Sequence, residues 1–181
     1  MATEQIQLAD PPRDLAAIAA LDNSLTFSSF TSETAWALGS LLRARLAQFT
    51  TPCVISIALA NNQQQLFYTA TRSGTVPDSD HWVSRKRKTV LRFGSSTWFM
   101  HNKFQGDEQA FAAKFGLGPN AGDYAIHGGG WPVRVKGVEG IVAVIVVSGL
   151  KQQEDHQIIV QTVADYLESV EGLELEKKKE D

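Results

Sequence analysis

The chain has 181 residues, of which 43% are hydrophobic and 20% are charged, a composition that is typical of a single globular domain. Its 17 lysine and arginine residues and 20 aspartate and glutamate residues give a net charge of −3, which excludes a generally basic nucleic-acid-binding protein and an acidic disordered chain. The single cysteine, Cys53, excludes an internal disulfide and a zinc site built from several cysteines.

No segment of the sequence has the pattern of a signal peptide or of a membrane span. Residues 1–7 lack the cationic start and the apolar stretch of a secretory signal. The longest unbroken apolar run, Ile141–Val147, has seven residues, whereas a membrane helix needs about 20. We therefore expect a cytoplasmic protein that is not inserted in a membrane.

The first third of the chain is predicted to contain two helices. Residues 1–10 are polar and are expected to be flexible, and a short helix is expected to open at Pro11–Pro12. Residues 24–30 indicate a short strand or an extended segment. Thr31 or Ser32 can cap the next helix, which is expected to end near Phe49. Apolar residues recur along it at steps of three and four and form one buried stripe: Leu38, Leu41, Leu42, Leu46 and Phe49.

The middle of the chain predicts a β-hairpin followed by a longer helix. Residues 54–59 and 65–71 have the pattern of two strands that are joined by a turn at Asn61–Asn62. The helix is expected to open at Pro77 and to end at Gly94, because glycine is the residue that most often terminates a helix.

The last part of the chain gives the clearest strand. Two short helices are expected over residues 98–104 and 107–115, before a glycine-rich loop. Residues 141–147 form an apolar, β-branched run, the pattern of a strand that is buried on both faces. A final helix is expected from about Gln152 to Glu171, and the charged residues 172–181 are expected to form a tail that projects into solvent.

These elements predict one domain, residues 11–171, of the α/β (α+β) class. A mainly antiparallel five-stranded sheet flanked by helices is expected at its centre, because the strands occur in hairpin-like pairs. No glycine-rich motif of the Rossmann or P-loop type occurs, so a nucleotide site is not expected.

A run of three glycines between His127 and Arg134 is the first candidate site. Successive backbone N–H groups in such a run can form an anion-binding concavity, to which Arg134 would add charge and His127 a titratable group. The alternative is a bulge or a close approach of the chain beside the sheet, which also requires glycine. The predicted ligand-binding residues are His127, Gly128, Gly129, Gly130 and Arg134, together with Arg85 and Arg92.

A basic cluster, Arg85–Lys88 with Arg92 further on, is the second candidate. On a helix Arg85, Lys88 and Arg92 share one face, which could bind a carboxylate or a phosphate group. The alternatives are a solvated helix face or a set of ion pairs between subunits. Nucleic acid is not an expected partner, because the rest of the chain has no extended basic surface.

The segment Glu154–His156, at the start of the last helix, is the third candidate. Asp155 is expected to cap this helix, and the alternative is that it orients His156 as a base. The four histidines are widely spaced, so no metal site is expected. None of them lies on a plainly apolar helix face that would suit an axial haem ligand.

Four segments, residues 82–93, 127–134, 146–150 and 154–156, carry a resemblance that extends from about Leu15 to Val170. Together they resemble a small uncharacterised family related to the haem-degrading-domain (GlcG/HbpS-like) proteins. The resemblance implies a sandwich-like α/β domain with a central antiparallel sheet and helices on its faces. It also implies homodimers that build larger assemblies, and it makes haem the one candidate cofactor.

Three functions remain open from the sequence. The first is a non-enzymatic, oligomeric interaction or scaffold protein; the high aromatic load between Trp82 and Phe111 favours an oligomer, because aromatic residues are enriched in interfaces. The second is a protein that binds a small anion or haem in the glycine-rich, arginine-lined pocket. The third is an acid–base enzyme that uses His127 or His156. It would need a nucleophile or a metal that the sequence does not provide, so no catalytic residue is predicted.

The C-terminal sequence suggests a partner for the first of these functions. Glu180 and Asp181 place two side-chain carboxylates beside the terminal carboxylate. This arrangement loosely resembles the acidic C-terminal peptides that cytosolic chaperones present to tetratricopeptide-repeat (TPR) co-chaperones, which capture a terminal carboxylate with fixed cationic groups. The alternative is a tail that serves only solubility.

Overall fold

The computed structural model describes residues 6–180, with side chains for residues 6–170. Three helices follow one another in the middle of the chain, and a short 3₁₀ helix precedes the last two strands. In order, the elements are α1 (Leu15–Ser24), β1 (Thr26–Phe27), α2 (Ser32–Leu46), β2 (Val54–Leu59), β3 (Gln65–Ala70), α3 (Asp78–Phe93), α4 (Thr97–Lys103), α5 (Glu108–Lys114), the 3₁₀ helix (Gly118–Asp123), β4 (Gly130–Val135), β5 (Ala143–Ser148) and α6 (Gln152–Glu180).

The five strands form one sheet in the order β1-β4-β5-β2-β3. β2 pairs antiparallel with β3 and with β5, and β4 pairs antiparallel with β5, whereas β1 runs parallel to β4. The predicted fold class is therefore confirmed: this is a single α+β domain whose five-stranded sheet is mostly antiparallel, with one parallel pair, and is flanked by helices.

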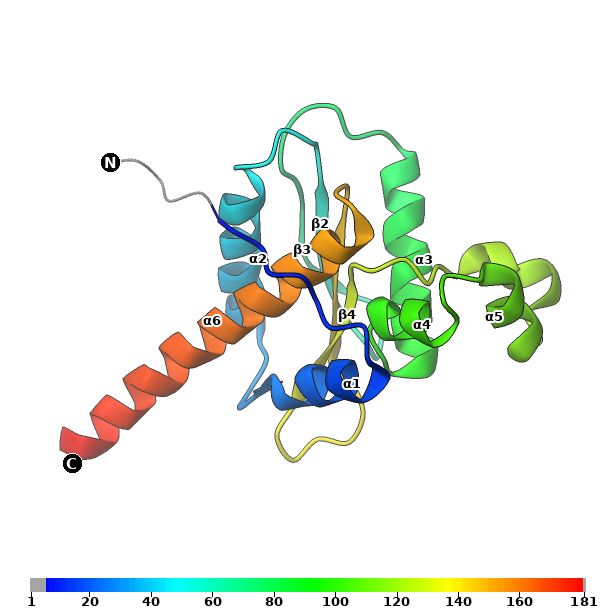
Figure 1. The fold of residues 1–181 in the computed structure, drawn as a ribbon. Helices are drawn as coiled ribbons and strands as arrows, with labels where there is room; N and C mark the ends of the chain where they lie inside the picture. Colours follow the sequence, from blue (N-terminus) through cyan, green and yellow to red (C-terminus); the bar gives the residue numbers. More distant parts are fainter. Residues whose placement is uncertain (1–5, 181) are drawn as a thin grey trace.

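The central strand β5 joins the two helical layers. Ile145 and Val147 lie in the core that the sheet shares with α2 and α6, whereas Val144 and Val146 pack against α3. Figure 1 shows α3 across the sheet from α2 and α6. Because both faces of this strand are buried, both sets of alternating residues must be apolar, which explains the unbroken apolar run in the sequence.

A third cluster, in the lobe formed by α4, α5 and the 3₁₀ helix, lies outside these layers. Its buried members are Met100, Phe111, Leu117 and Ile126. The ring of Phe93, at the end of α3, packs against Phe111 and Phe115 with centroid distances of 5.5 and 4.4 Å. The lobe thus buries within one chain much of the aromatic surface that the sequence analysis assigned to a subunit interface.

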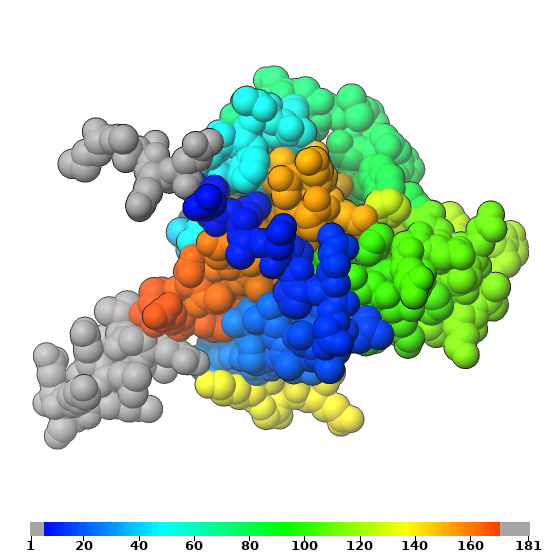
Figure 2. Space-filling model, viewed as in Figure 1, coloured from blue at the N-terminus to red at the C-terminus, as the bar shows by residue number. Residues whose placement is uncertain are grey.

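The segment that precedes α1 crosses in front of α6 (Figure 1) and contacts Trp98 of α4. Figure 2 shows it in dark blue, over the face between α6 (orange) and α4 (green). The indole Nε1–H of Trp98 donates to the carbonyl oxygen of Pro12 at 2.8 Å, and the guanidinium of Arg13 lies 5.2 Å from the centre of the Trp98 ring. The helix itself begins only after Asp14, whose carboxylate accepts from the N–H of Ala17. The prolines therefore precede α1 and do not open it.

Two helix ends differ from the sequence prediction. α2 is capped by Thr31, as predicted, but ends at Leu46 and not near Phe49. α6 continues to Glu180, beyond the predicted end at Glu171. The side chain of Glu180 and the whole of Asp181, on which the TPR prediction depends, lie outside the described residues.

A buried histidine contradicts the expectation that no histidine lies on a plainly apolar helix face. His156 of α6 is fully buried, and its ring stacks on Trp98 at a centroid distance of 5.8 Å. Neither ring nitrogen has a hydrogen-bond partner among the described residues. Burial lowers the pKa of His156 to about 3, so the ring is neutral near pH 7.

We expect His156→Leu to stabilise the protein at pH 7 by about 1 kcal/mol or more, because it removes two buried polar atoms without partners. The advantage should grow by about 2 kcal/mol at pH 5, because the unfolded wild-type chain takes up a proton below pH 6.5 that the folded protein excludes until about pH 3. Urea unfolding at both pH values measures this, with the exposed His81→Leu as control. A gap between variant and wild type that is the same at both pH values would contradict this account of His156.

Candidate functional site

A cavity of about 290 Å³ opens at the end of the sheet where β5 finishes and β2 begins. The first half of α3 and the first turn of α6 form its other walls. Trp82 and Leu150 supply apolar surface, His127 supplies an imidazole, and Lys86 and Asp155 supply buried charges. A concave site that combines apolar walls with a few polar groups is the usual form of a small-molecule site.

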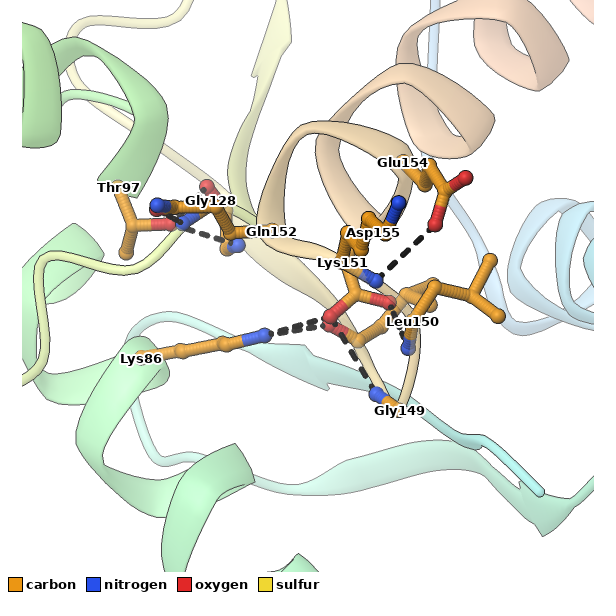
Figure 3. A network of polar contacts seen from close by, with 11 residues as sticks. Lys86, Thr97, Gly128, Gly149, Leu150, Lys151, Gln152, Glu154 and Asp155 are labelled. Atoms are coloured by element: carbon orange, nitrogen blue, oxygen red, sulfur yellow. Dashed lines mark hydrogen bonds and ion pairs between the residues drawn. The ribbon is translucent and has the colours of Figure 1, made fainter. Parts of the chain in front are cut away.

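Lys86 and Asp155 form a buried ion pair in this cavity. The distance from Lys86 Nζ to Asp155 Oδ2 is 3.1 Å, and each side chain is only 3% exposed. The same ammonium donates to the carbonyl oxygen of Val147 at 2.9 Å, so the pair connects α3, β5 and α6 (Figure 3). Burial raises the pKa of Asp155 to about 6, although the positive charge of Lys86 acts in the opposite direction.

Asp155 also holds the turn between β5 and α6. Its Oδ1 accepts from the N–H of Leu150 at 3.0 Å, and its Oδ2 accepts from the N–H of Gly149 at 3.3 Å. The expected capping role is not what the structure shows, because these two N–H groups precede α6 and Asp155 therefore fastens the turn. Glu154 is the residue that accepts from the N–H of Lys151, directly before the helix, at 3.1 Å. The alternative, in which Asp155 orients His156, is wrong, because the His156 nitrogens have no partner among the described residues.

The basic cluster 85–88 is not one solvated face. Lys86 is buried against the sheet, whereas Lys88 is exposed and pairs with Asp123 at 2.9 Å. Lys86 lines the cavity, and it is absent from the ligand-binding residues predicted from the sequence. A signal was available, because Lys86 lies three residues after Val83 and four before Val90, both of which face the core.

The glycine run is a place of close chain approach. A Cβ atom on Gly128 would lie 2.3 Å from the carbonyl oxygen of Gln152, and one on Gly129 would lie 2.3 Å from that of Val147 and 2.7 Å from Lys86 Nζ. Gly129 also has a φ of +112°, which side-chain-bearing residues rarely adopt. The alternative reading of this run as a close approach beside the sheet is confirmed; its role in ligand binding stays a prediction.

His127, which directly precedes the glycines, lines the cavity with a half-exposed ring. Its imidazole packs edge-on against Trp82 with a centroid distance of 5.0 Å. Its Nδ1 lies 3.3 Å from Glu108 Oε1, and the side chain is 42% exposed. Burial, reinforced by the charges of Lys86 and Arg85, lowers the pKa of His127, although Glu108 acts in the opposite direction. The ring is therefore neutral at pH 7.

The structure does not bring the three predicted arginines together at this cavity. Arg85 is nearby, with its guanidinium 4.7 Å from the centre of the Trp82 ring. Arg92 lies over Phe93 and Tyr124 in the aromatic lobe. Arg134 donates to the carbonyl oxygen of Gly94 at 2.6 Å and lines a separate cavity of about 110 Å³.

The described residues contain no group of three or more histidine, cysteine, aspartate or glutamate side chains arranged to hold a metal ion. Within residues 6–180, no helix combines the length and the apolar character that crossing a membrane would require.

Known proteins resemble this chain over most of its length. The model of a family described as "Haem degrading protein HbpS-like" matches residues 30–164. A UPF0303 protein of Streptomyces coelicolor is 40% identical over 146 residues, which cover 81% of this chain and 89% of that protein. The crystal structure of Ybr137w protein superposes with a TM-score of 0.80 at 32% identity, and the match covers 87% of this chain and 89% of that one.

A more distant structure shares the fold alone. The crystal structure described as a PduOC:Heme complex superposes with a TM-score of 0.60 at 20% identity, covering 75% of this chain and 94% of that one.

We expect Lys86→Met to lower the free energy of unfolding by about 3–5 kcal/mol at pH 7, because it leaves a buried carboxylate without its counter-charge. Part of the loss should be recovered at pH 5, where Asp155 of the folded variant takes up a proton before the unfolded chain does. Urea unfolding measures both effects. As a control, Lys88→Met breaks an exposed ion pair on the same helix and should lower the free energy of unfolding by at most about 1 kcal/mol. The double variant Lys86→Met/Asp155→Asn should lose less free energy of unfolding than Lys86→Met alone, because it leaves no unpaired buried charge. Equal losses for Lys86→Met and Lys88→Met would show that the buried pair is not a stabilising contact.

Proposed function

This chain belongs to the HbpS-like family, and on that basis we propose that it is a ligand-binding protein that takes haem, with the imidazole of His127 as the iron ligand. The observation that carries the proposal is the state of this ring: it is half exposed, neutral and beside a cavity. Iron binds the neutral form of imidazole, and haem sites use an axial histidine next to apolar surface, which Trp82 provides here.

Glu108 fits the second role that such a site needs. A metal-binding histidine usually donates its other ring N–H to a carboxylate, which fixes the tautomer and the orientation of the ring. Oε1 of Glu108 lies 3.3 Å from Nδ1, which makes no hydrogen bond to the described residues. A small rotation of the half-exposed Glu108 side chain would let it accept the Nδ1–H and leave Nε2 of His127 for iron. The described PduOC:Heme complex supports haem as the ligand through the shared fold.

The size of the cavity limits how much of a haem it can enclose. Its volume of about 290 Å³ is at the lower end of the roughly 300–1,000 Å³ that ligand pockets span. Haem would therefore lie over the mouth, at His127, and not fill the interior. The charges inside the cavity also argue against a small anion as the ligand. Two carboxylates, Asp78 and Asp155, line the cavity, and Lys86 is the one cation among the lining residues described.

Titration with haemin tests this proposal. We expect a shifted Soret band with the wild-type protein and its loss in His127→Ala, while Glu108→Gln should weaken binding by about 10–100-fold through the orientation of the ring. His81→Ala, at an exposed position on α3, is the control and should bind as wild type does. An unchanged Soret band in His127→Ala would reject His127 as the ligand.

A second candidate function is that of an oligomeric interaction protein. The observation that favours it is an apolar groove of about 600 Å³ between α2 and the edge strand β3. Trp36 and Tyr68 line this groove and are 68% and 49% exposed. Large exposed aromatic residues beside an unpaired strand edge are typical of interaction surfaces. We propose that a second copy of the chain binds this groove in the cytoplasm. A TPR co-chaperone would bind separately, at the acidic C-terminus.

Two measurements test these contacts. Light scattering at micromolar concentration should give a mass well above 19.8 kDa, and Trp36→Ser should lower that mass. A carboxylate-clamp TPR domain should retain the full-length protein but not a protein ending at Gly172. A monomeric wild-type protein would exclude the oligomer, and equal retention of both lengths, or none, would exclude the tail.

A further inference from the structure

We propose that the floor of the cavity between α3 and α6 binds the carbonyl oxygen of a small, uncharged organic molecule, with Lys86 as the hydrogen-bond donor. This position lies in the same cavity as His127 but at its buried end, where Lys86 is 3% exposed, whereas His127 is 42% exposed. The proposal stands whether or not haem binds there.

The hydrogen bonds of Lys86 leave one donor free. An ammonium group has three N–H bonds, and the described residues provide two acceptors, the carbonyl oxygen of Val147 and Oδ2 of Asp155. Lys86 also lines the cavity. Because a buried donor without an acceptor costs about 1–3 kcal/mol, more when it is charged, a ligand oxygen that accepts this third N–H gains affinity from the unsatisfied group.

The ammonium is held in place before any ligand arrives. Asp155 is fixed by the N–H groups of Gly149 and Leu150, as Figure 3 shows, and it in turn positions Lys86. Gly129 packs so closely that a single added carbon would lie 2.7 Å from Nζ. Such a preorganised donor loses little conformational entropy on binding, which is the condition for a selective contact.

Two other lining residues also carry donors without acceptors. The hydroxyl of Ser148 and the indole N–H of Trp82 have no hydrogen-bond acceptor within residues 6–170. Asp155, by contrast, already accepts three hydrogen bonds. The residues beside Lys86 therefore offer donors, and this part of the cavity suits a ligand group that accepts, although Asp78 adds an acceptor elsewhere in the lining.

The charges around the cavity favour a neutral acceptor over an anion. Lys86 is already neutralised by Asp155, and Asp78 adds a further carboxylate to the lining. His127 contributes no charge at pH 7. A carboxylate or phosphate would be repelled by the carboxylate of Asp78, which has no counter-charge among the lining residues described, whereas a ketone or amide oxygen is uncharged and can still accept the free N–H. Trp82 and Leu150 can cover the apolar body of a molecule with about one ring, which matches a volume of about 290 Å³.

The test uses three single-ring probes of similar shape with the haem-free, full-length protein. Acetophenone carries a neutral carbonyl group, ethylbenzene lacks it, and benzoate carries an anion. We expect amide NMR titration to show binding of acetophenone at least about tenfold tighter than binding of either other probe, a difference that corresponds to about 1.4 kcal/mol. The shifted signals should include the amides of Gly149 and Leu150 and exclude that of Gly94, beside the separate cavity at Arg134.

Variants separate the role of Lys86 from that of the apolar walls. Lys86→Met/Asp155→Asn removes both charges together and should reduce acetophenone binding to the level of ethylbenzene, whereas Lys88→Met should bind as wild type does. The probe titration of the wild-type protein decides the matter even if the double variant does not fold. Equal affinities for acetophenone and ethylbenzene, a preference for benzoate, or retained selectivity in the folded double variant would each overturn the proposal. Haem binding is measured by the Soret band and acetophenone binding by the amide shifts, so a failure of the haem proposal is recognised separately.

Discussion

The buried contact between Lys86 and Asp155 is the constraint on which the rest of this site depends. It joins residues that are 69 positions apart, and through Val147 it also joins the helices to the central strand. Removing two charges from water is costly, so such a pair persists only where the geometry is good and further hydrogen bonds satisfy its atoms. Here the turn before α6 supplies those bonds, and the absence of a side chain at Gly129 supplies the space.

The cavity lies outside the two hydrophobic cores that cover the faces of the sheet. The cores on the two faces of β5 are closed by α2 and α6 on one side and by α3 on the other. The cavity lies at the end of the sheet, where β2 and β5 meet the turns that lead into and out of them. A ligand can therefore enter without displacing residues of these two cores.

The sequence predicts this fold well because its signals are local. The hairpin of β2 and β3, the cap at Thr31 and the apolar run of β5 each depend on a few neighbouring residues. The site depends instead on contacts between distant segments. Lys86 looks like one member of a basic run, and only the packing of α3 shows that it alone is buried. His127 and Arg134 are close in sequence, but the intervening strand extends by roughly 3.3 Å per residue and carries them to different cavities.

The burial of the ion pair has a consequence for how this protein responds to its ionic surroundings. Mobile ions weaken interactions between exposed charges, and nearly abolish them beyond a Debye length of about 8 Å at physiological ionic strength, but they screen buried charges far less. Salt will therefore act on surface pairs such as Lys88 with Asp123, which are about half exposed, and leave the pair of Lys86 with Asp155 almost untouched. The ion pair at the floor of the cavity should therefore depend little on the salt concentration of the surrounding solution.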